Sequence, residues 1–472
     1  MLAYAGDFLI YLMFLPTPGL HFRPDFSRCG ANRIIQVTRR DASQSCLVWF
    51  MLCGRGPGMN ATELSVDASA TGANRTGVYL AILQLVFSLG WTTYAIYLPK
   101  LAAEVGIAPS AVILILMLDQ AIFTITDTAM GIAADKIAPV VGRLGGFVGT
   151  LTALSCAAFV ALPFVAGTGP GAQAWFIALI VIWSITSSAL RAPPLTLLGK
   201  HRAKSSIPFL SALAMLGYGL AGAASPYLGV ALRNQDPRLP FVISSVVLLI
   251  TALALSGVER GLKEEPSSPI EPAEAAIPLG RIPVMFITSM VILALGYQLH
   301  FSVNSAPFYL RFAKPDDLQW LMPVFWIGFN IAMFPASVIT KHRGGLIVMG
   351  AAGLLGALAV LGAEFAGNLN TLIAAQFIAG AAWGCMLMSA ISAALAIGDS
   401  GAEGKVVGLV FSALALATFA RLAAVAGGLQ KLPEYAPLLH WAPVACWSVA
   451  GAGLLVIAAS RAQQGTRRVR AI

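Results

Sequence analysis

Residues 119–143 read DQAIFTITDTAMGIAADKIAPVVGR, so two aspartates lie inside an apolar run that precedes a short basic loop. At about 100° per residue, Asp119 and Asp127 are roughly 80° apart around a helix and about 12 Å apart along it. Because ionised side chains are costly inside a membrane span, both carboxylates need partners, water or a proton. The two can share one protein-facing side, where Gly131 allows a second helix to approach closely.

The composition around this stretch predicts a polytopic membrane protein. The 472 residues are 58% hydrophobic and only 11% charged, and the mean hydropathy is +0.79. A water-soluble protein of this length needs more surface charge, so lipid is the expected solvent. The net charge of +9 comes from Lys and Arg scattered through short loops. That pattern is typical of membrane orientation and argues against nucleic-acid binding.

Twelve apolar runs are long enough to cross about 30 Å of hydrocarbon as helices. Six precede a polar, Pro-rich stretch and six follow it. This order predicts an N-terminal bundle over 77–257, a cytoplasmic linker over 258–281, a C-terminal bundle over 282–460 and a basic cytoplasmic tail over 461–472. The predicted spans are 77–98, 110–133, 144–166, 173–196, 207–231, 239–257, 282–305, 319–340, 345–366, 369–396, 405–428 and 438–460.

The basic residues orient these spans. With the segment before the first span placed in the cytoplasm, the even-numbered loops, the central linker and the C-terminal tail carry fifteen Lys and Arg, and the loops on the opposite side carry six. This bias predicts twelve spans in the plasma (inner) membrane with both termini cytoplasmic. We predict a monomer whose partners are a small-molecule solute and the lipid bilayer.

The N-terminal extension, residues 1–76, does not fit this scheme. Its apolar stretches are too short to span a bilayer, and they lack the basic region and cleavage site of a signal peptide. We predict that the extension is disordered. Because Met59 is followed by a polar leader typical of a cytoplasmic start, residues 1–58 are either disordered or not translated.

The loop after the two aspartates resembles the loop between the second and third helices of the major facilitator superfamily. That motif has the form G-x-x-x-D-[RK] followed by G-R, supplied here by Gly131, Asp135, Lys136, Gly142 and Arg143. The resemblance implies an all-α fold of twelve transmembrane helices in two pseudo-symmetric six-helix bundles. It also implies a substrate site between the bundles and alternating access. Asp135 would then be a gate latch that pairs with basic groups or a helix terminus of the other half in one state.

The longer spacing between Lys136 and Gly142 is similar to that of the glycoside–pentoside–hexuronide:cation symporter branch. That likeness implies sodium- or proton-coupled sugar transport. Two further stretches carry the same likeness: Arg191-Ala-Pro-Pro-Leu-Thr-Leu-Leu in the fourth span and Glu403-Gly404-Lys405 at the start of the eleventh.

Asn330 and five charged or titratable residues within the predicted spans are candidates for coupling or substrate binding. Asp119 is either a coupling site or a carboxyl capped by a neighbouring hydroxyl, and Asp127 belongs to the gate network or to cation coupling. For Arg191 and Arg421 the alternatives are snorkelling to the interface, favoured for Arg191, and contact with an anionic substrate. For His300, a hydrogen-bonded interfacial residue is favoured over a proton relay.

Other polar and aromatic positions can line a cavity or form ordinary interhelical hydrogen bonds. They are Gln84, Trp91, Thr92, Tyr94, Gln298, Asn304, Asn330, Gln376 and Trp383.

The motif content narrows the function to transport. The sequence has no G-x-x-x-x-G-K-[ST] loop, no HExxH or GxSxG motif, and no CxxC spacing among its six cysteines. We predict no catalytic residues, no metal site and no cofactor beyond a coupling H⁺ or Na⁺. The leading function is a secondary active transporter for a sugar-like or other organic solute. The alternatives are a proton antiporter exporting drugs or metabolites, and a non-transporting assembly factor built on a carrier fold.

Overall fold

The structure is a computed structural model that describes residues 61–137, 143–165, 169–199, 204–261, 281–399 and 401–470. Within these residues every regular element is a helix. The predictions for residues 1–58, for Met59, for Gly142 and for most of the linker lie outside the described residues.

Twelve helices in the described part are long and apolar enough to cross a membrane, six between Asn74 and Arg260 and six between Ile282 and Ser460. The first six spans are built from α3 (Ala61–Glu104), α4 (Val112–Ile137), α5 (Arg143–Ala161), α6 (Ala172–Ser187), α8 (Ile207–Leu232), and α9 (Arg238–Leu253) with α10 (Leu255–Gly261). The other six are built from α11 (Arg281–Leu299), α14 (Pro323–Arg343), α15 (Gly345–Glu364), α16 (Leu369–Ile397), α17 (Glu403–Ala426) and α18 (Ala436–Arg470). This confirms the predicted fold class.

The surface of the bundle is apolar, as lipid requires. Large hydrophobic side chains on the described helices are widely exposed, for example Ile125 at 72%, Leu358 at 66% and Ile250 at 65%. A face of this kind is unfavourable in water and favourable in hydrocarbon. The chain is therefore an integral membrane protein.

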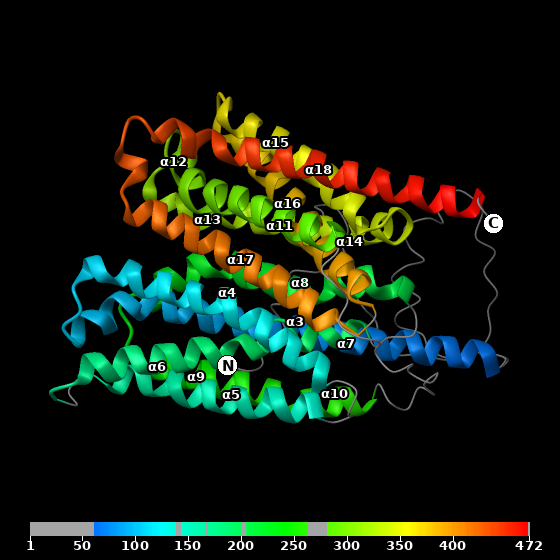
Figure 1. The fold of residues 1–472 in the computed structure, drawn as a ribbon. Helices are drawn as coiled ribbons and strands as arrows, with labels where there is room; N and C mark the ends of the chain where they lie inside the picture. Colours follow the sequence, from blue (N-terminus) through cyan, green and yellow to red (C-terminus); the bar gives the residue numbers. More distant parts are fainter. Residues whose placement is uncertain are drawn as a thin grey trace, which may run out of the picture. The chain divides into compact units, whose positions relative to one another are not determined.

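The N-terminal and C-terminal halves meet chiefly through two pairs of helices. α4 packs along α17, and α8 packs along α14; Figure 1 shows α4 and α17 side by side. We call the end of the bundle that carries Lys136, Lys341 and Lys405 the basic end, because the positive-inside bias assigns these lysines to one side.

The fourth span is broken near its middle. α6 ends at Ser187 and gives way to two 3₁₀ turns, Ser188–Leu190 and Pro193–Leu195, before the short α7 (Thr196–Gly199). Proline lacks an N–H and clashes with the preceding turn, so Pro193 and Pro194 end the regular ladder. Gln84 of α3 donates its side-chain N–H to the carbonyl oxygen of Leu190 at 3.3 Å, which satisfies one of the freed backbone groups.

Three helices continue for several residues into segments that were predicted to lie outside the two bundles. α3 begins at Ala61 within the predicted disordered extension, α10 continues to Gly261 within the predicted linker, and α18 continues to Arg470 within the predicted tail. Hydropathy detects only the part of a helix that lies in lipid, so a polar extension of the same helix carries no signal.

Close packing inside the C-terminal half depends on glycine, which gives a stability prediction. A Cβ atom added at the buried Gly380 of α16 would collide with the carbonyl oxygen of Phe325 on α14. We expect Gly380→Ala to destabilise the fold by about 1–3 kcal/mol through overpacking, seen as a melting temperature several degrees lower. Gly146→Ala is the control, because no atom lies within 4 Å of a Cβ there. Equal melting temperatures for the two variants would contradict this packing.

Candidate functional site

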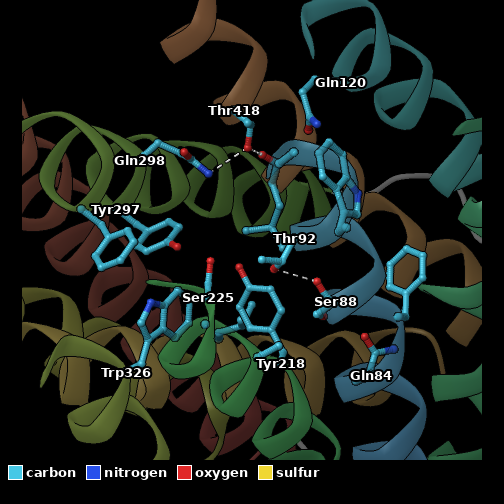
Figure 2. Close-up of a pocket in the computed structure, with 18 of the residues that line it drawn as sticks. Gln84, Ser88, Thr92, Gln120, Tyr218, Ser225, Tyr297, Gln298, Trp326 and Thr418 are labelled. Atoms are coloured by element: carbon cyan, nitrogen blue, oxygen red, sulfur yellow. Dashed lines mark hydrogen bonds between the residues drawn. The ribbon is translucent and has the colours of Figure 1, made fainter. Parts of the chain in front are cut away.

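A cavity of about 670 Å³ lies at the junction of the two halves. It is lined from α3, α4 and α8 of the N-terminal half and from α11, α14 and α17 of the C-terminal half. This volume lies within the range of about 300–1,000 Å³ that small-molecule sites occupy. Figure 2 shows the side chains of Thr92, Tyr218, Ser225 and Tyr297 turned into one common space.

The lining residues of α4 and α17 lie between the middle of these helices and the end of the bundle opposite the basic end. On α4 the lining residues are Leu116, Gln120 and Phe123, and on α17 they begin at Phe411. The stretches of α4 and α17 nearer the basic end pack against each other instead. The cavity is therefore closed toward the basic end.

An ion pair forms the floor of the cavity. The Asp127 carboxylate of α4 lies 2.8 Å from the guanidinium of Arg191, and the exposed fractions of the two side chains are 0% and 14%. Arg191 follows the first 3₁₀ turn of the broken fourth span, and the neighbouring Thr126 and Ser188 hydroxyls are 2.6 Å apart. The helix break thus brings a cation from the fourth span onto the acidic face of α4.

Phenyl rings from both halves enclose the Arg191 guanidinium. Its central carbon lies 4.8 Å from the ring centre of Phe123 on α4 and 5.1 Å from that of Phe411 on α17. The favoured snorkelling interpretation of Arg191 was wrong, because the side chain turns inward to Asp127 and lines the cavity. A buried carboxylate is a stronger partner than the distant interface, since an unpaired charge at this depth is costly.

Arg421 lies on the opposite wall of the same cavity. Its Nε donates to Oε1 of Gln298 on α11 at 3.0 Å, and the Gln298 amide nitrogen donates to the hydroxyl of Thr418 at 2.8 Å. All three residues line the cavity, and the bond between Gln298 and Thr418 is drawn in Figure 2. Gln298 therefore holds Arg421 in place against the cavity.

The Asp135 carboxylate lies on the N-terminus of α17. Oδ1 accepts the backbone N–H of Gly404 at 2.6 Å, and Oδ2 accepts the backbone N–H of Lys405 at 2.7 Å. These two N–H groups belong to the first turn of the helix, where they lack intrahelical partners. They form the positive end of the helix dipole, which attracts the carboxylate. The contact joins the two halves at the basic end, as the motif resemblance implies for one state of a latch.

Small residues continue this contact toward the cavity. A Cβ atom at Gly131 would collide with the Gly404 carbonyl oxygen, and one at Gly408 would meet the carbonyl oxygen of Asp127 at 2.6 Å. Farther along, the hydroxyls of Thr128 and Ser412 are 2.7 Å apart. We call this α4–α17 contact, from Asp135 to Thr128 and from Gly404 to Ser412, the basic-end seam.

The sequence carries a signal for this seam. Gly404, Gly408 and Ser412 recur every fourth residue on α17, which is the small-residue spacing of close helix contacts. The two other described members of the loop motif, Lys136 and Arg143, are exposed at the basic end.

Asp119 lies away from the cavity lining. Its carboxylate is fully buried and accepts the hydroxyl of Tyr94 at 2.8 Å and the hydroxyl of Ser184 at 2.6 Å. Both donors belong to the N-terminal half. Of the two alternatives for Asp119, this geometry is the carboxyl capped by neighbouring hydroxyls.

His300 and Asn330 also lie outside the cavity lining in the described residues. His300 begins a π-helical turn at the end of α11, and its Nε2 lies 3.0 Å from the side-chain oxygen of Gln376. His300 is 0% exposed, and its side chain is hydrogen-bonded, as the favoured interpretation expects, inside the C-terminal half. Asn330 of α14 packs against Gly219 of α8, where a Cβ would collide with its side-chain oxygen.

Among the other polar positions singled out from the sequence, Gln84, Trp91, Thr92 and Gln298 line the cavity. Tyr94, Asn304, Gln376 and Trp383 are buried inside one half or the other. The sequence reasoning missed most aromatic residues of the lining, among them Tyr218, Tyr297 and Trp326.

Comparison with known proteins supports a single fold family. The sequence profile of the Major Facilitator Superfamily matches residues 80–419. The chain superposes on the E. coli fucose:proton symporter FucP with a TM-score of 0.60 at 13% identity, covering 80% of this chain and 98% of that one. No protein of curated function matches it.

Two further solved structures are similar. A bacterial homologue of the iron transporter ferroportin, in an outward-facing state, gives a TM-score of 0.61 at 12% identity, covering 82% of this chain and 99% of that one. The human organic anion transporter MFSD10 gives 0.56 at 15% identity, covering 81% and 98%. At these identities the likeness is one of fold.

Proposed function

The chain belongs to the major facilitator superfamily, and we propose that it is a secondary active transporter that carries a small organic solute by alternating access. The observation that carries the proposal is the cavity between the halves, which is closed at one end by the basic-end seam. A carrier needs one solute site and a barrier on one side that can be exchanged for a barrier on the other.

The seam has the properties of a barrier that can open. Its polar contacts include two N–H bonds to Asp135 and one hydroxyl pair, and Gly131, Gly404 and Gly408 let the two backbones approach closely. At these glycine positions the two backbones meet without interlocking side chains, so the two helices can separate there. We propose that Asp135 is the latch of this barrier and that the basic end is cytoplasmic.

We place proton coupling at the ion pair of Asp127 and Arg191. A proton on Asp127 would cancel its charge and release the guanidinium, which already faces the cavity. Proton binding and solute binding would then favour each other by the same factor, as linkage requires. Asp119 is a weaker candidate, because two hydroxyls already satisfy it away from the cavity.

The named functions of the similar structures fit a coupled carrier without deciding its cargo. One is a fucose:proton symporter and another is an organic anion transporter. We propose a monomer in the plasma (inner) membrane with both termini cytoplasmic. Membership of the sugar symporter branch stays a prediction.

Proteoliposomes that contain a pH-sensitive dye test the carrier proposal. Sugars, organic anions and cationic amphiphiles are added outside, with and without a sodium gradient. We expect at least one solute to drive proton movement in the parent protein. If folded protein shows no proton movement and no uptake with any solute of the panel, transport is contradicted and the assembly-factor alternative is favoured. Sodium-dependent uptake without proton movement would contradict proton coupling.

The Asp119→Asn variant separates the two buried aspartates. We expect it to keep solute-driven proton movement and to lose stability, because hydrogen bonds to a charged group contribute about 1.5–3 kcal/mol each. Ser184→Ala, which removes one donor to the same carboxylate, should lower the melting temperature in the same direction. Loss of proton movement in Asp119→Asn at an unchanged melting temperature would move the coupling site from Asp127 to Asp119.

A further inference from the structure

The charge of the cavity is unbalanced. Arg191 and Arg421 are the charged residues among those that line it in the described part of the chain. Asp127 neutralises Arg191. No carboxylate of the described residues is paired with Arg421, whose side chain donates to the neutral amide of Gln298. The cavity therefore carries one uncompensated positive charge.

Arg421 cannot remove this imbalance by losing its proton, because a guanidinium stays charged in proteins. Its Nε is held by Gln298, so the two terminal nitrogens are left to bind a further acceptor. Those nitrogens form the face that pairs with a carboxylate through two parallel hydrogen bonds. The wall of the cavity thus presents a preformed half of an arginine–carboxylate pair.

In alternating access the cavity closes around the solute, and Arg421 then needs a negatively charged partner. While the cavity is open, water can solvate Arg421. When the open end closes around the solute, that water is reduced and an unpaired guanidinium inside the membrane becomes costly. An anionic solute removes this cost, an uncharged sugar does not, and a cation increases it.

The rest of the lining favours an amphipathic solute. The aromatic side chains of Trp91, Tyr218 and Trp326 come from three different helices, and Figure 2 shows the hydroxyls of Thr92 and Ser225 in the same space. Aromatic walls bury an apolar body, while a few hydroxyls and amides fix its orientation.

From these observations, and resting on the proposed carrier function, we infer that the solute is an amphipathic organic monoanion. Its carboxylate is bound by Arg421 beside Gln298, and its apolar body lies against the aromatic walls. While Asp127 is ionised and paired with Arg191, the single uncompensated charge selects one negative charge on the solute. The Asp127–Arg191 pair at the floor stays available for the proton.

The inference is tested by equilibrium binding to the purified full chain, read by quenching of tryptophan fluorescence. The probes are 1-naphthoate with its neutral amide, 1-naphthamide, and decanoate with decanamide. Each pair differs in charge at nearly constant shape. We expect the parent protein to bind at least one acid about 30-fold more tightly than its amide, as a charge-assisted bidentate pair allows.

Three variants test whether Arg421 causes the preference for the acid over its amide. Arg421→Gln should abolish the acid-over-amide ratio, and Arg421→Lys should keep part of it, because the charge remains without the planar fork. Arg311→Gln, which removes an exposed arginine paired with Glu364, should leave the ratio unchanged. The comparison in the parent protein needs no variant, so the inference is testable even if Arg421→Gln fails to fold.

The outcomes separate this inference from the carrier proposal. Equal binding of acid and amide in both pairs, or no binding of either acid, overturns the inference, as does an undiminished ratio in Arg421→Gln. Acid-selective binding that depends on Arg421 without any flux in proteoliposomes supports the anion site and contradicts the carrier function. Coupled uptake of an uncharged sugar supports the carrier function and contradicts the anion site.

Discussion

Asp127→Asn is expected to lower solute-driven proton movement about 100-fold, which corresponds to a coupling free energy of about 3 kcal/mol. Asparagine cannot take up a proton, so the gradient no longer controls the release of Arg191. The measurement is the initial rate of dye response in proteoliposomes after solute addition. Asp127→Glu is the matched control, because it keeps an ionisable carboxyl and should keep part of the coupled flux.

Stability measurements on the same pair check that the effect arises from the ion pair itself. Removing one partner of a buried pair costs about 3–5 kcal/mol, so Arg191→Gln should lower the melting temperature strongly. The double variant Asp127→Asn with Arg191→Gln removes both charges and should regain stability without regaining coupling. Full coupling in Asp127→Asn would refute the assignment.

Asp135→Ala is expected to shift the protein toward a state open at the basic end. The carboxylate accepts two backbone N–H groups of α17, and bonds to a charged group contribute about 1.5–3 kcal/mol each. A net loss of about 3 kcal/mol changes the ratio of closed to open forms about 100-fold. The shift appears as a longer distance between spin labels at Gly146→Cys and His342→Cys, measured without the six native cysteines.

Asp316→Ala is the control for the latch, because it removes an exposed carboxyl at the end of the bundle opposite the basic end. It should leave the distance distribution unchanged. An Asp135→Ala distribution identical to that of the parent would show that the carboxylate does not hold the halves together.

The fold followed from the sequence because bilayer thickness sets the length of apolar runs. The predicted span 207–231 corresponds to Ile207–Leu232, and 369–396 corresponds to Leu369–Ile397. The Asp135 contact was anticipated by resemblance, since a carboxylate at a helix mouth has few partners other than a facing helix terminus.

The site could be predicted only in part, because its contacts join distant parts of the chain. Nothing local in the sequence links Gln298 to Arg421, which are 123 positions apart. Arg191 was misjudged because depth was counted along an unbroken helix, whereas Pro193 and Pro194 break the span and leave its side chain beside Asp127. For Asp119 the sequence left both alternatives open, because depth along a span does not show whether a carboxyl faces a cavity or the hydroxyls of its own half.

Chemical labelling of a cavity residue from each side of the membrane tests alternating access most directly. Ser225 lines the cavity, so Ser225→Cys in a background without native cysteines reports which side can reach it. In vesicles of known orientation, we predict reaction with an impermeant maleimide from the side opposite the basic end. With Asp135→Ala added, we predict that labelling from the basic end becomes about 10-fold faster than in Ser225→Cys alone. This increase is smaller than the change of about 100-fold expected in the ratio of closed to open forms. Labelling that stays confined to one side, whatever residue is at position 135, would contradict a carrier whose cavity opens to each side in turn.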